Sequence, residues 1–173
     1  MELKETDRWF TPQDPILDHV ALMWPDTGIQ TDPCFDPDPA CAVTAKLTYD
    51  ARTGQNGLIM PWVGRTYICP PYSAPAPWLM RALTHSMSGG EVIGLLNVAA
   101  GSSAWRQYVW DQAVILFLWK RIKFTKAGST KSSPNPTDSA VLYWGADKDR
   151  FIEVWGRLGH IVDPRHGPLA VAA

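Results

Sequence analysis

The sequence has no long hydrophobic run and no strong net charge. No stretch of its 173 residues approaches the roughly 20 apolar residues that a membrane-spanning helix needs. The apolar run at 113–119 is too short to span a membrane and is typical of a buried strand. The net charge of −1 excludes a uniformly basic nucleic-acid-binding chain, so any DNA contact requires a local basic patch. We expect no membrane partner.

Cysteines are too few and too irregularly placed for a disulfide scaffold or a zinc site. Cys34, Cys41 and Cys69 show no paired spacing with the four histidines, so we predict no metal. The odd number of cysteines and the lack of a signal peptide are typical of a reducing compartment. We therefore expect a cytoplasmic protein, and a monomer or weak dimer.

The chain does contain enough apolar residues for one globular domain. They make up 46% of the sequence against 19% charged residues, a balance that allows a sizeable buried core. We expect the domain over residues 9–164, with an N-terminal segment over 1–8 and a loose C-terminal tail over 165–173. The nine tryptophans are expected mainly in the core and in loops.

Hydrophobic periodicity predicts helices that alternate with strands. Helical spacing occurs in four stretches: 12–24 (with Thr11 as its N-cap), 76–86, 102–110 and 148–158. Strands are expected at 28–31, 65–69, 91–98, 113–119, 139–144 and 160–163, whereas 40–49 fits either type. The polar stretch 129–139 is expected to be a mobile loop. This alternation predicts an α/β fold covered by helices on both faces of its sheet.

Two loops rich in proline follow predicted strands. The first is Asp32–Pro37 and the second is Cys69–Ser73. In open α/β sheets, ligands bind beyond the carboxyl ends of the strands. Both loops are therefore candidate parts of a binding site.

Five motifs occur along the chain in a fixed order. They are Trp9–Pro12, Asp32–Asp36, Asn56–Leu58 with Trp62 downstream, Cys69–Ser73 with Trp78 downstream, and Lys120–Phe124. In order and spacing they resemble the motifs of the phage-type DNA N6-adenine methyltransferases. The Pro-Pro-Tyr-Ser element after a strand is the most specific of them, and the others are individually weak.

The resemblance implies a Rossmann-like domain with a mixed, mostly parallel sheet that binds S-adenosylmethionine. It also implies a phage-encoded enzyme that methylates N6 of an adenine flipped out of double-stranded DNA. The implied catalytic residues are Cys69, Pro70, Pro71 and Tyr72. In that family an Asn or Asp side chain and the next proline carbonyl accept the amino hydrogens, and the tyrosine stacks on the base.

The resemblance also assigns residues to the cofactor and to DNA. Asp32 is the candidate partner of the methionine ammonium or of a ribose hydroxyl, because a carboxylate is a charge-assisted acceptor for both. The implied cofactor-binding residues are Thr11, Pro12, Asp32, Pro33, Cys34 and Asp50. The implied DNA contacts are Ser73, Lys120, Arg121, Lys123 and Lys126, and the four basic ones suit phosphates. Alternatively, Asp32 is a turn residue and the basic run is a solvated loop.

Cys69 departs from the family pattern, because it stands where the family has Asn or Asp. A thiol is a weak hydrogen-bond acceptor, and losing one positioned contact of this kind costs roughly 2–4 kcal/mol. Three interpretations stay open: slow or specialised methylation, a catalytically inactive protein that binds DNA or a protein partner, or replacement of the acceptor by Asn97 or Ser102. A fourth, covalent attack of Cys69 on a pyrimidine ring, requires a base and an acid partner that the sequence does not identify. An RNA or small-molecule substrate would share the same chemistry.

Overall fold

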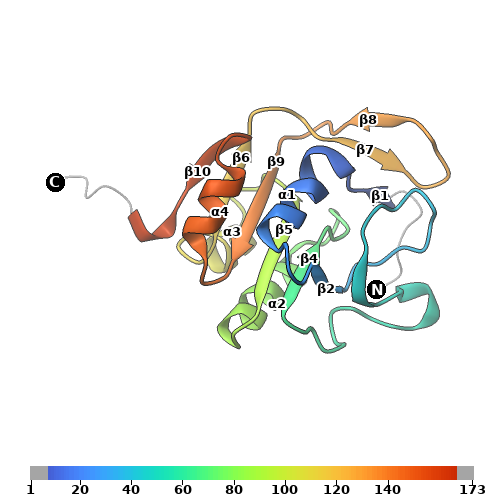
Figure 1. Cartoon of the computed structure of the whole chain (residues 1–173), viewed down its shortest axis with the longest axis horizontal. Helices are drawn as coiled ribbons and strands as arrows, with labels where there is room; N and C mark the ends of the chain where they lie inside the picture. Colours follow the sequence, from blue (N-terminus) through green and yellow to red (C-terminus); the bar gives the residue numbers. More distant parts are fainter. Residues whose placement is uncertain (1–7, 167–173) are drawn as a thin grey trace.

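The computed structural model describes residues 8–166, and its centre is a seven-stranded sheet (Figure 1). The strands lie in the order β10-β6-β9-β5-β4-β2-β3. Their bounds are β2 Ile29–Asp32, β3 Ala45–Thr48, β4 Arg65–Ile68, β5 Glu91–Asn97, β6 Val114–Leu118, β9 Ser139–Trp144 and β10 Gly159–Val162. The region 40–49, which fitted either type, contains a strand only over Ala45–Thr48.

The sheet is mixed. The pairs β2–β3, β2–β4 and β4–β5 are parallel, whereas β5–β9, β9–β6 and β6–β10 are antiparallel. Strands β2 to β6 consequently run in one direction and end at the same edge, called here the carboxyl edge. The expected α/β fold with a mixed sheet is confirmed. The mostly parallel Rossmann-like arrangement is not confirmed, because the pairs divide equally between the two types.

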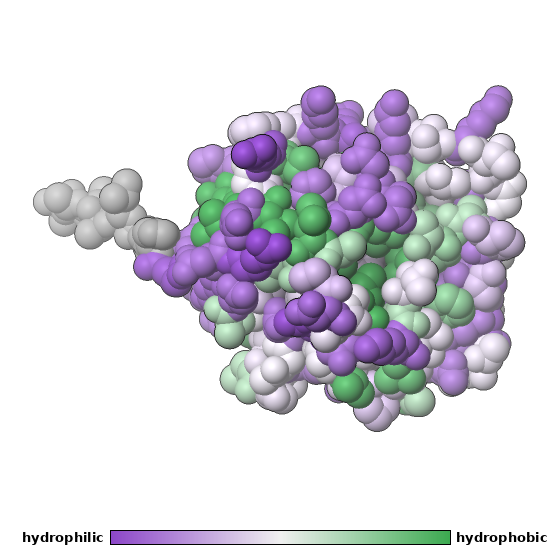
Figure 2. All heavy atoms as spheres, viewed as in Figure 1, coloured by the Kyte–Doolittle hydropathy of each residue, from purple (hydrophilic) through white to green (hydrophobic). Residues whose placement is uncertain are grey.

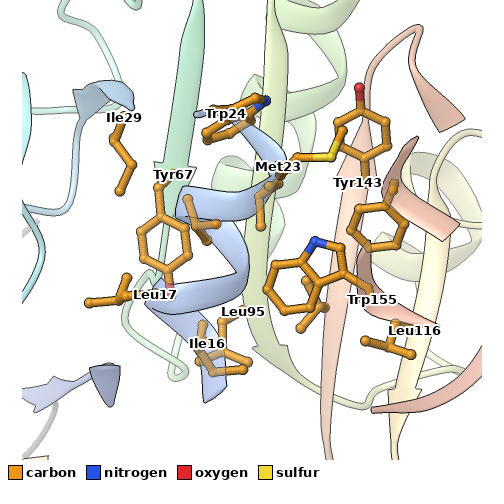
Figure 3. Close-up of a cluster of buried hydrophobic side chains, with 14 of the residues drawn as sticks. Ile16, Leu17, Met23, Trp24, Ile29, Tyr67, Leu95, Leu116, Tyr143 and Trp155 are labelled. Carbon is orange, nitrogen blue, oxygen red and sulfur yellow. The ribbon is translucent and has the colours of Figure 1, made fainter. Parts of the chain in front are cut away.

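Helices cover both faces of the sheet. Helices α1 (Asp18–Met23) and α4 (Lys148–Trp155) pack in one core cluster, and α2 (Ala76–Met87) and α3 (Ser103–Tyr108) pack in the other. Alternation along β5 supplies both clusters, because Ile93 faces the first and Val92 the second. Figure 3 shows the first cluster filling the space between α1 and the strands.

A stack of aromatic rings anchors α4 to the sheet. The rings of Tyr143 and Phe151 lie 5.0 Å apart and nearly parallel, and Trp155 continues the stack at 5.6 Å from Phe151. All three side chains are fully buried. Burial of each contributes roughly 1.5–3 kcal/mol, which makes this side of the sheet a rigid base for the loops at the carboxyl edge.

A second, three-stranded sheet lies beyond the carboxyl edge, at the top of the view in Figure 1. It consists of β1 (Trp9–Phe10), β7 (Lys123–Lys126) and β8 (Ser132–Pro134), all antiparallel. The expected mobile loop at 129–139 is therefore wrong in part. Backbone pairing of β8 with β7 orders this polar segment, although its strand residues are exposed.

The first predicted helix is shorter than expected. An irregular helical turn, η2 (Gln13–Leu17), precedes α1, and Asp14 within it has an extended backbone with φ −95° and ψ 130°. The residue before a proline disfavours helical angles, and Pro15 follows Asp14. Thr11 is not an N-cap, because its hydroxyl hydrogen-bonds the hydroxyl of Tyr67 at 2.8 Å.

The strand predicted at 139–144 matches β9, and the other predicted elements differ from the observed ones by at most three residues at their ends. Two short turns of 3-10 helix also occur, η3 (Ala51–Thr53) and η4 (Pro164–His166). Near the chain ends, Arg8 pairs with Asp36 and Arg165 pairs with Asp163. Residues 1–7 and 167–173 lie outside the described part, so the division into 1–8, 9–164 and 165–173 stays a prediction. Within residues 8–166, no helix is both long and apolar enough to cross a membrane.

Candidate active site

The two loops predicted to form the site lie side by side. Strands β2 and β4 are neighbours and parallel, so the chain leaves both at the carboxyl edge. Beyond them, Asp32 and Cys34 of the first loop and Cys69 and Pro71 of the second line one small hollow that is open to solvent. This central hollow brings together residues about 35 positions apart in the sequence.

Two further hollows adjoin the central hollow. The Tyr49 hollow contains Tyr49, Pro33 and Trp78, and it shares Cys34 and Pro71 with the central one. The Tyr72 hollow shares Trp9 with the central hollow, and its lining residues are Trp9, Tyr72, Asn97, Phe124, Ser133, Pro134, Asn135 and Pro136. The carboxyl edge therefore carries a row of three hollows, with the Asp32 loop and the Cys69 loop between them.

Asp32 is a buried carboxyl group without a cationic partner. Its side chain is 3% exposed and accepts one hydrogen bond, from the backbone N–H of Cys34 at 2.9 Å. No Lys, Arg or His side chain among residues 8–166 forms an ion pair with it. Burial raises the pKa of Asp32 from 3.8 to about 7, against the lowering effect of the Cys34 N–H. A bound cation would offset this desolvation.

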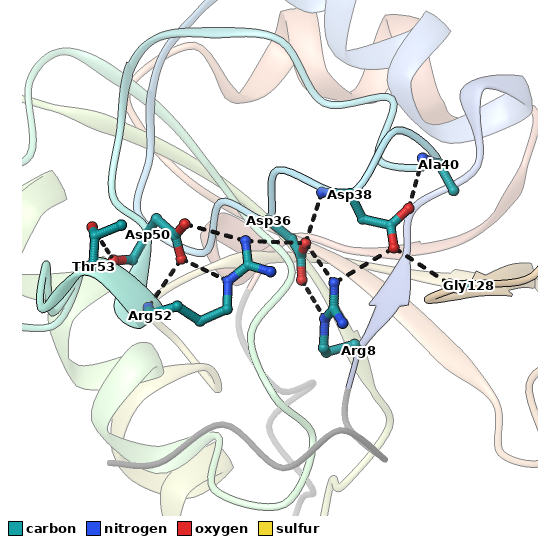
Figure 4. Close-up of polar contacts among 8 residues, drawn as sticks. All are labelled: Arg8, Asp36, Asp38, Ala40, Asp50, Arg52, Thr53 and Gly128. Atoms are coloured by element: carbon teal, nitrogen blue, oxygen red, sulfur yellow. Dashed lines mark hydrogen bonds and ion pairs between the residues drawn. The ribbon is translucent and has the colours of Figure 1, made fainter.

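Two other acidic side chains, Asp36 in the first loop and Asp50 after β3, are already paired (Figure 4). Arg8 donates two hydrogen bonds to Asp36, at 2.7 and 2.9 Å, and Arg52 pairs with Asp50 at 3.0 Å. Partial burial raises the pKa of Asp36, but the bonds from Arg8 outweigh it and hold the pKa below its usual value. The Asp50 carboxylate also accepts the backbone N–H of Arg52 and so caps η3.

Cys69 is a half-buried thiol that faces Tyr72. Its Sγ lies 3.9 Å from the Tyr72 hydroxyl. Burial raises the pKa of Cys69 to about 11, although contacts with Thr11 and Tyr72 lower it. The thiol is therefore protonated at neutral pH, which does not favour attack by a thiolate. It offers a substrate only a weak acceptor or a weak donor.

Tyr72 is held by an aromatic contact on one side. Its ring meets the buried ring of Phe124 edge-on, at 6.0 Å between centroids and 82° between planes. Tyr72 itself is half-buried and lines the hollow named after it. Pro70 is buried behind the turn, and Ser73 is exposed beyond it. Strand β7, which was not among the predicted strands, therefore supports Tyr72 through Phe124.

The predicted DNA contacts lie at the same edge. Lys120, Arg121 and Lys123 line a larger hollow together with Pro12, so Pro12 lies away from the central hollow. The Nζ of Lys126 instead lies over the ring of Trp9, at 6.0 Å from its centroid. In Figure 2, hydrophilic side chains project along the upper margin of the molecule, over β7 and β8.

Sequence reasoning missed Arg8 and Asn135. Arg8 fixes the first loop through Asp36, but an isolated arginine near a chain end carries no local signal. Asn135 is 7% exposed, although its neighbours Pro134 and Pro136 are exposed. An asparagine between two prolines is typical of a turn. Its burial becomes visible only in the tertiary structure.

Comparison with known proteins identifies a family. The family model described as DNA N-6-adenine-methyltransferase (Dam) matches residues 2–154. No curated protein matched the chain, and no solved structure did. The match includes both loops of the central hollow and all three hollows at the carboxyl edge. It confirms the resemblance seen in the motifs, and the chain belongs to the DNA N-6-adenine-methyltransferase (Dam) family.

Proposed function

We propose that the protein transfers a methyl group from S-adenosylmethionine to N6 of an adenine turned out of double-stranded DNA. The observation that carries this proposal is the row of hollows at the carboxyl edge, where the Asp32 loop and the Cys69–Tyr72 turn meet. We infer that the cofactor and the base lie side by side along this row. Family membership supports adenine methylation in general.

The central hollow and the Tyr49 hollow fit the cofactor. Asp32 would hold the methionine ammonium, since it is a buried carboxyl group that no cationic side chain among residues 8–166 neutralises. Thr11 and Cys34 would contact the same end, and Pro12 would approach it only if the N-terminal segment moved. The adenosine end would lie in the Tyr49 hollow, beside Pro33 and next to Asp50. The bound cofactor supplies an electrophilic methyl carbon.

The Tyr72 hollow fits the target base. The ring of Tyr72 would stack on the extruded adenine and replace the stacking lost from the duplex. The Pro70 carbonyl would accept one amino hydrogen, and Pro71 would shape the passage toward the cofactor. Holding the amino nitrogen in line with the methyl group is then the main contribution to the rate. Cys69 would add only a weak contact.

Phosphate contacts would come from the basic side chains around the base. Lys120, Arg121 and Lys123 line one hollow, and Lys126 lies over the ring of Trp9, which lines the Tyr72 hollow. Ser73 is exposed next to Tyr72 and would reach the strand that carries the base. Such contacts position DNA without reading its sequence. We further propose a phage-encoded enzyme that acts in the host cytoplasm as a monomer or weak dimer.

A second candidate function rests on Cys69. A protonated thiol at the position of the family's amide or carboxylate supports a catalytically weakened protein that binds cofactor and DNA, or a protein partner, without efficient turnover. Comparing Cys69→Asn with the native chain separates the two candidates. If only the variant methylates DNA, the native chain is the binding protein.

Calorimetry and methyl transfer test the main proposal. The chain is titrated with S-adenosylmethionine and then incubated with adenine-containing DNA and a labelled methyl donor, after which the DNA is digested to nucleosides. We expect saturable binding and label in N6-methyladenine. RNA and free nucleotides serve as competing substrates. Binding without transfer to any of them would contradict the enzymatic proposal, and absence of binding would contradict both candidates.

A further inference from the structure

Asn135 is the one strongly buried side chain in the exposed segment 132–138. Both hydrogens of its amide are used, because Nδ2 donates to Oδ1 of Asn97 at 2.6 Å and to Oγ of Ser139 at 3.0 Å. Its backbone N–H donates to the carbonyl of Ile122 at 2.8 Å. These bonds fix the Asn135 side chain at the wall of the Tyr72 hollow. Because the Asn135 amide is buried and fully hydrogen-bonded, it restricts the orientation of the side chain that it contacts.

The group it contacts is the side-chain amide of Asn97. Asn97 ends β5, which is the strand next to β4 and its Cys69 turn. The bond from Asn135 orients the Asn97 carbonyl oxygen, which keeps one lone pair for a second donor. The Nδ2 of Asn97 has no hydrogen-bond partner among the residues that the structure describes. Asn97 is half-buried and lines the same hollow as Tyr72.

We propose that Asn97, oriented by Asn135, supplies the amide that reads the adenine edge and replaces the acceptor missing at Cys69. This inference rests on the proposed function and deepens it. The remaining lone pair of Asn97 Oδ1 accepts an amino hydrogen of the base, and its Nδ2 donates to the adjacent ring nitrogen. Adenine presents this donor-acceptor pair, and an asparagine amide is complementary to it. Asn135 is a positioning residue, since it acts through Asn97.

A double-substitution cycle tests the replacement. Methyl transfer to adenine-containing DNA is measured for the native chain, Asn97→Ala, Cys69→Asn and the double variant. Asn97→Ala should lose roughly 100-fold in kcat/KM, as removal of one positioned contact does elsewhere. Cys69→Asn should raise the rate of Asn97→Ala by about ten-fold or more and should raise the rate of the native chain by less, because the two sites supply one contact. Gln107→Ala, which removes an exposed amide on α3, is the matched control.

Equal effects of Cys69→Asn in both backgrounds would overturn the proposal, because a purely structural role for Asn97 is not rescued at residue 69. Asn135→Ala adds a positioning readout. It should lower kcat more than it raises KM, and Cys69→Asn should rescue it as well. Loss of kcat without rescue would indicate that Asn135 only stabilises the loop.

Base binding tests the inference independently of methyl transfer. The probes are 2′-deoxyadenosine 5′-monophosphate and the matched purine nucleotide that lacks the amino group. The native chain should prefer the adenine nucleotide by roughly ten-fold, the value of about one hydrogen bond, and Asn97→Ala should bind both equally. If Asn97→Ala keeps the preference, the inference is wrong, whether or not the chain methylates DNA. If the preference is lost but no chain methylates DNA, only the proposed enzymatic function fails.

Discussion

Replacing Asp32 by asparagine should stabilise the ligand-free protein and weaken its binding of the cofactor. The carboxyl group is 3% exposed, and its pKa is about 7 in the folded chain against 3.8 as its ordinary value. At 1.36 kcal/mol per pKa unit, this difference amounts to about 4 kcal/mol of lost stability when the group is fully ionised. The loss is the cost of desolvating the Asp32 carboxylate, which the ammonium of a bound cofactor would offset.

The sign of the pH dependence follows from proton binding. Between pH 3.8 and about pH 7 the folded state holds a proton on Asp32 that the unfolded state has released. The free energy of unfolding therefore falls as the pH rises through this range, and the full loss is present above pH 7. The loss is about 4 kcal/mol at pH 8 but only about 1.5 kcal/mol at pH 5.

Urea denaturation of Asp32→Asn at two pH values measures this contribution. The variant should gain stability over the native chain, and the gain should be larger at pH 8 than at pH 5 by about 2.5 kcal/mol. Asp26→Asn, which changes an exposed carboxyl group, is the matched control. An equal gain for Asp32→Asn at both pH values would refute the reasoning, because it would come from packing and not from charge.

Cofactor affinity should move in the opposite direction. Removing one partner of a buried ion pair costs about 2–5 kcal/mol, so Asp32→Asn should bind S-adenosylmethionine roughly 30-fold more weakly or worse in calorimetry. The native chain should bind more tightly as the pH rises through 7, since Asp32 must ionise. Unchanged affinity in the variant would show that the ammonium lies elsewhere.

Three further predictions concern the loop, the base and the DNA. Arg8→Ala should lower the free energy of unfolding by about 1–2 kcal/mol in thermal denaturation, because it removes two charged hydrogen bonds to Asp36, and Arg8→Lys should restore only part of it. Tyr72→Ala should lower methyl transfer by the loss of about 1–3 kcal/mol of stacking, whereas Tyr72→Phe should keep most of it; equal losses would contradict stacking. In anisotropy titrations, Lys123→Ala should reduce the slope of log DNA affinity against log salt concentration by about one. Lys46→Ala, in the edge strand β3 of the main sheet, should leave this slope unchanged.

Most of the main sheet could be predicted from sequence, because its strands are buried and their apolar runs end at clear breakers. The run in β6 and the Gly89–Gly90 turn before β5 are examples. The direction of β9 was not predictable in the same way. A fully buried strand has the same pattern whether it pairs parallel or antiparallel, and β9 is buried along its whole length. The sequence pattern therefore could not correct the mostly parallel sheet that the resemblance implied.

The small sheet was missed for the opposite reason. Its strand β8 is exposed at every residue, so no apolar alternation marks it, and its order comes from backbone pairing with β7. The site was predicted through its two loops, since each follows a buried strand. The pairing of Asp50 with Arg52 was not predicted. Which carboxylate stays unpaired depends on the arginines that the fold brings near it.

A crystal structure of the chain with S-adenosylhomocysteine would show directly whether the Asp32 loop and the Tyr72 turn enclose one site. The predicted result is an amino group against the Asp32 carboxylate, an adenosine beside Tyr49, and an empty space left over Tyr72 for a base. Product bound instead among Lys120, Arg121 and Leu158, or a Tyr72 hollow closed by packed side chains in the complex, would contradict the account.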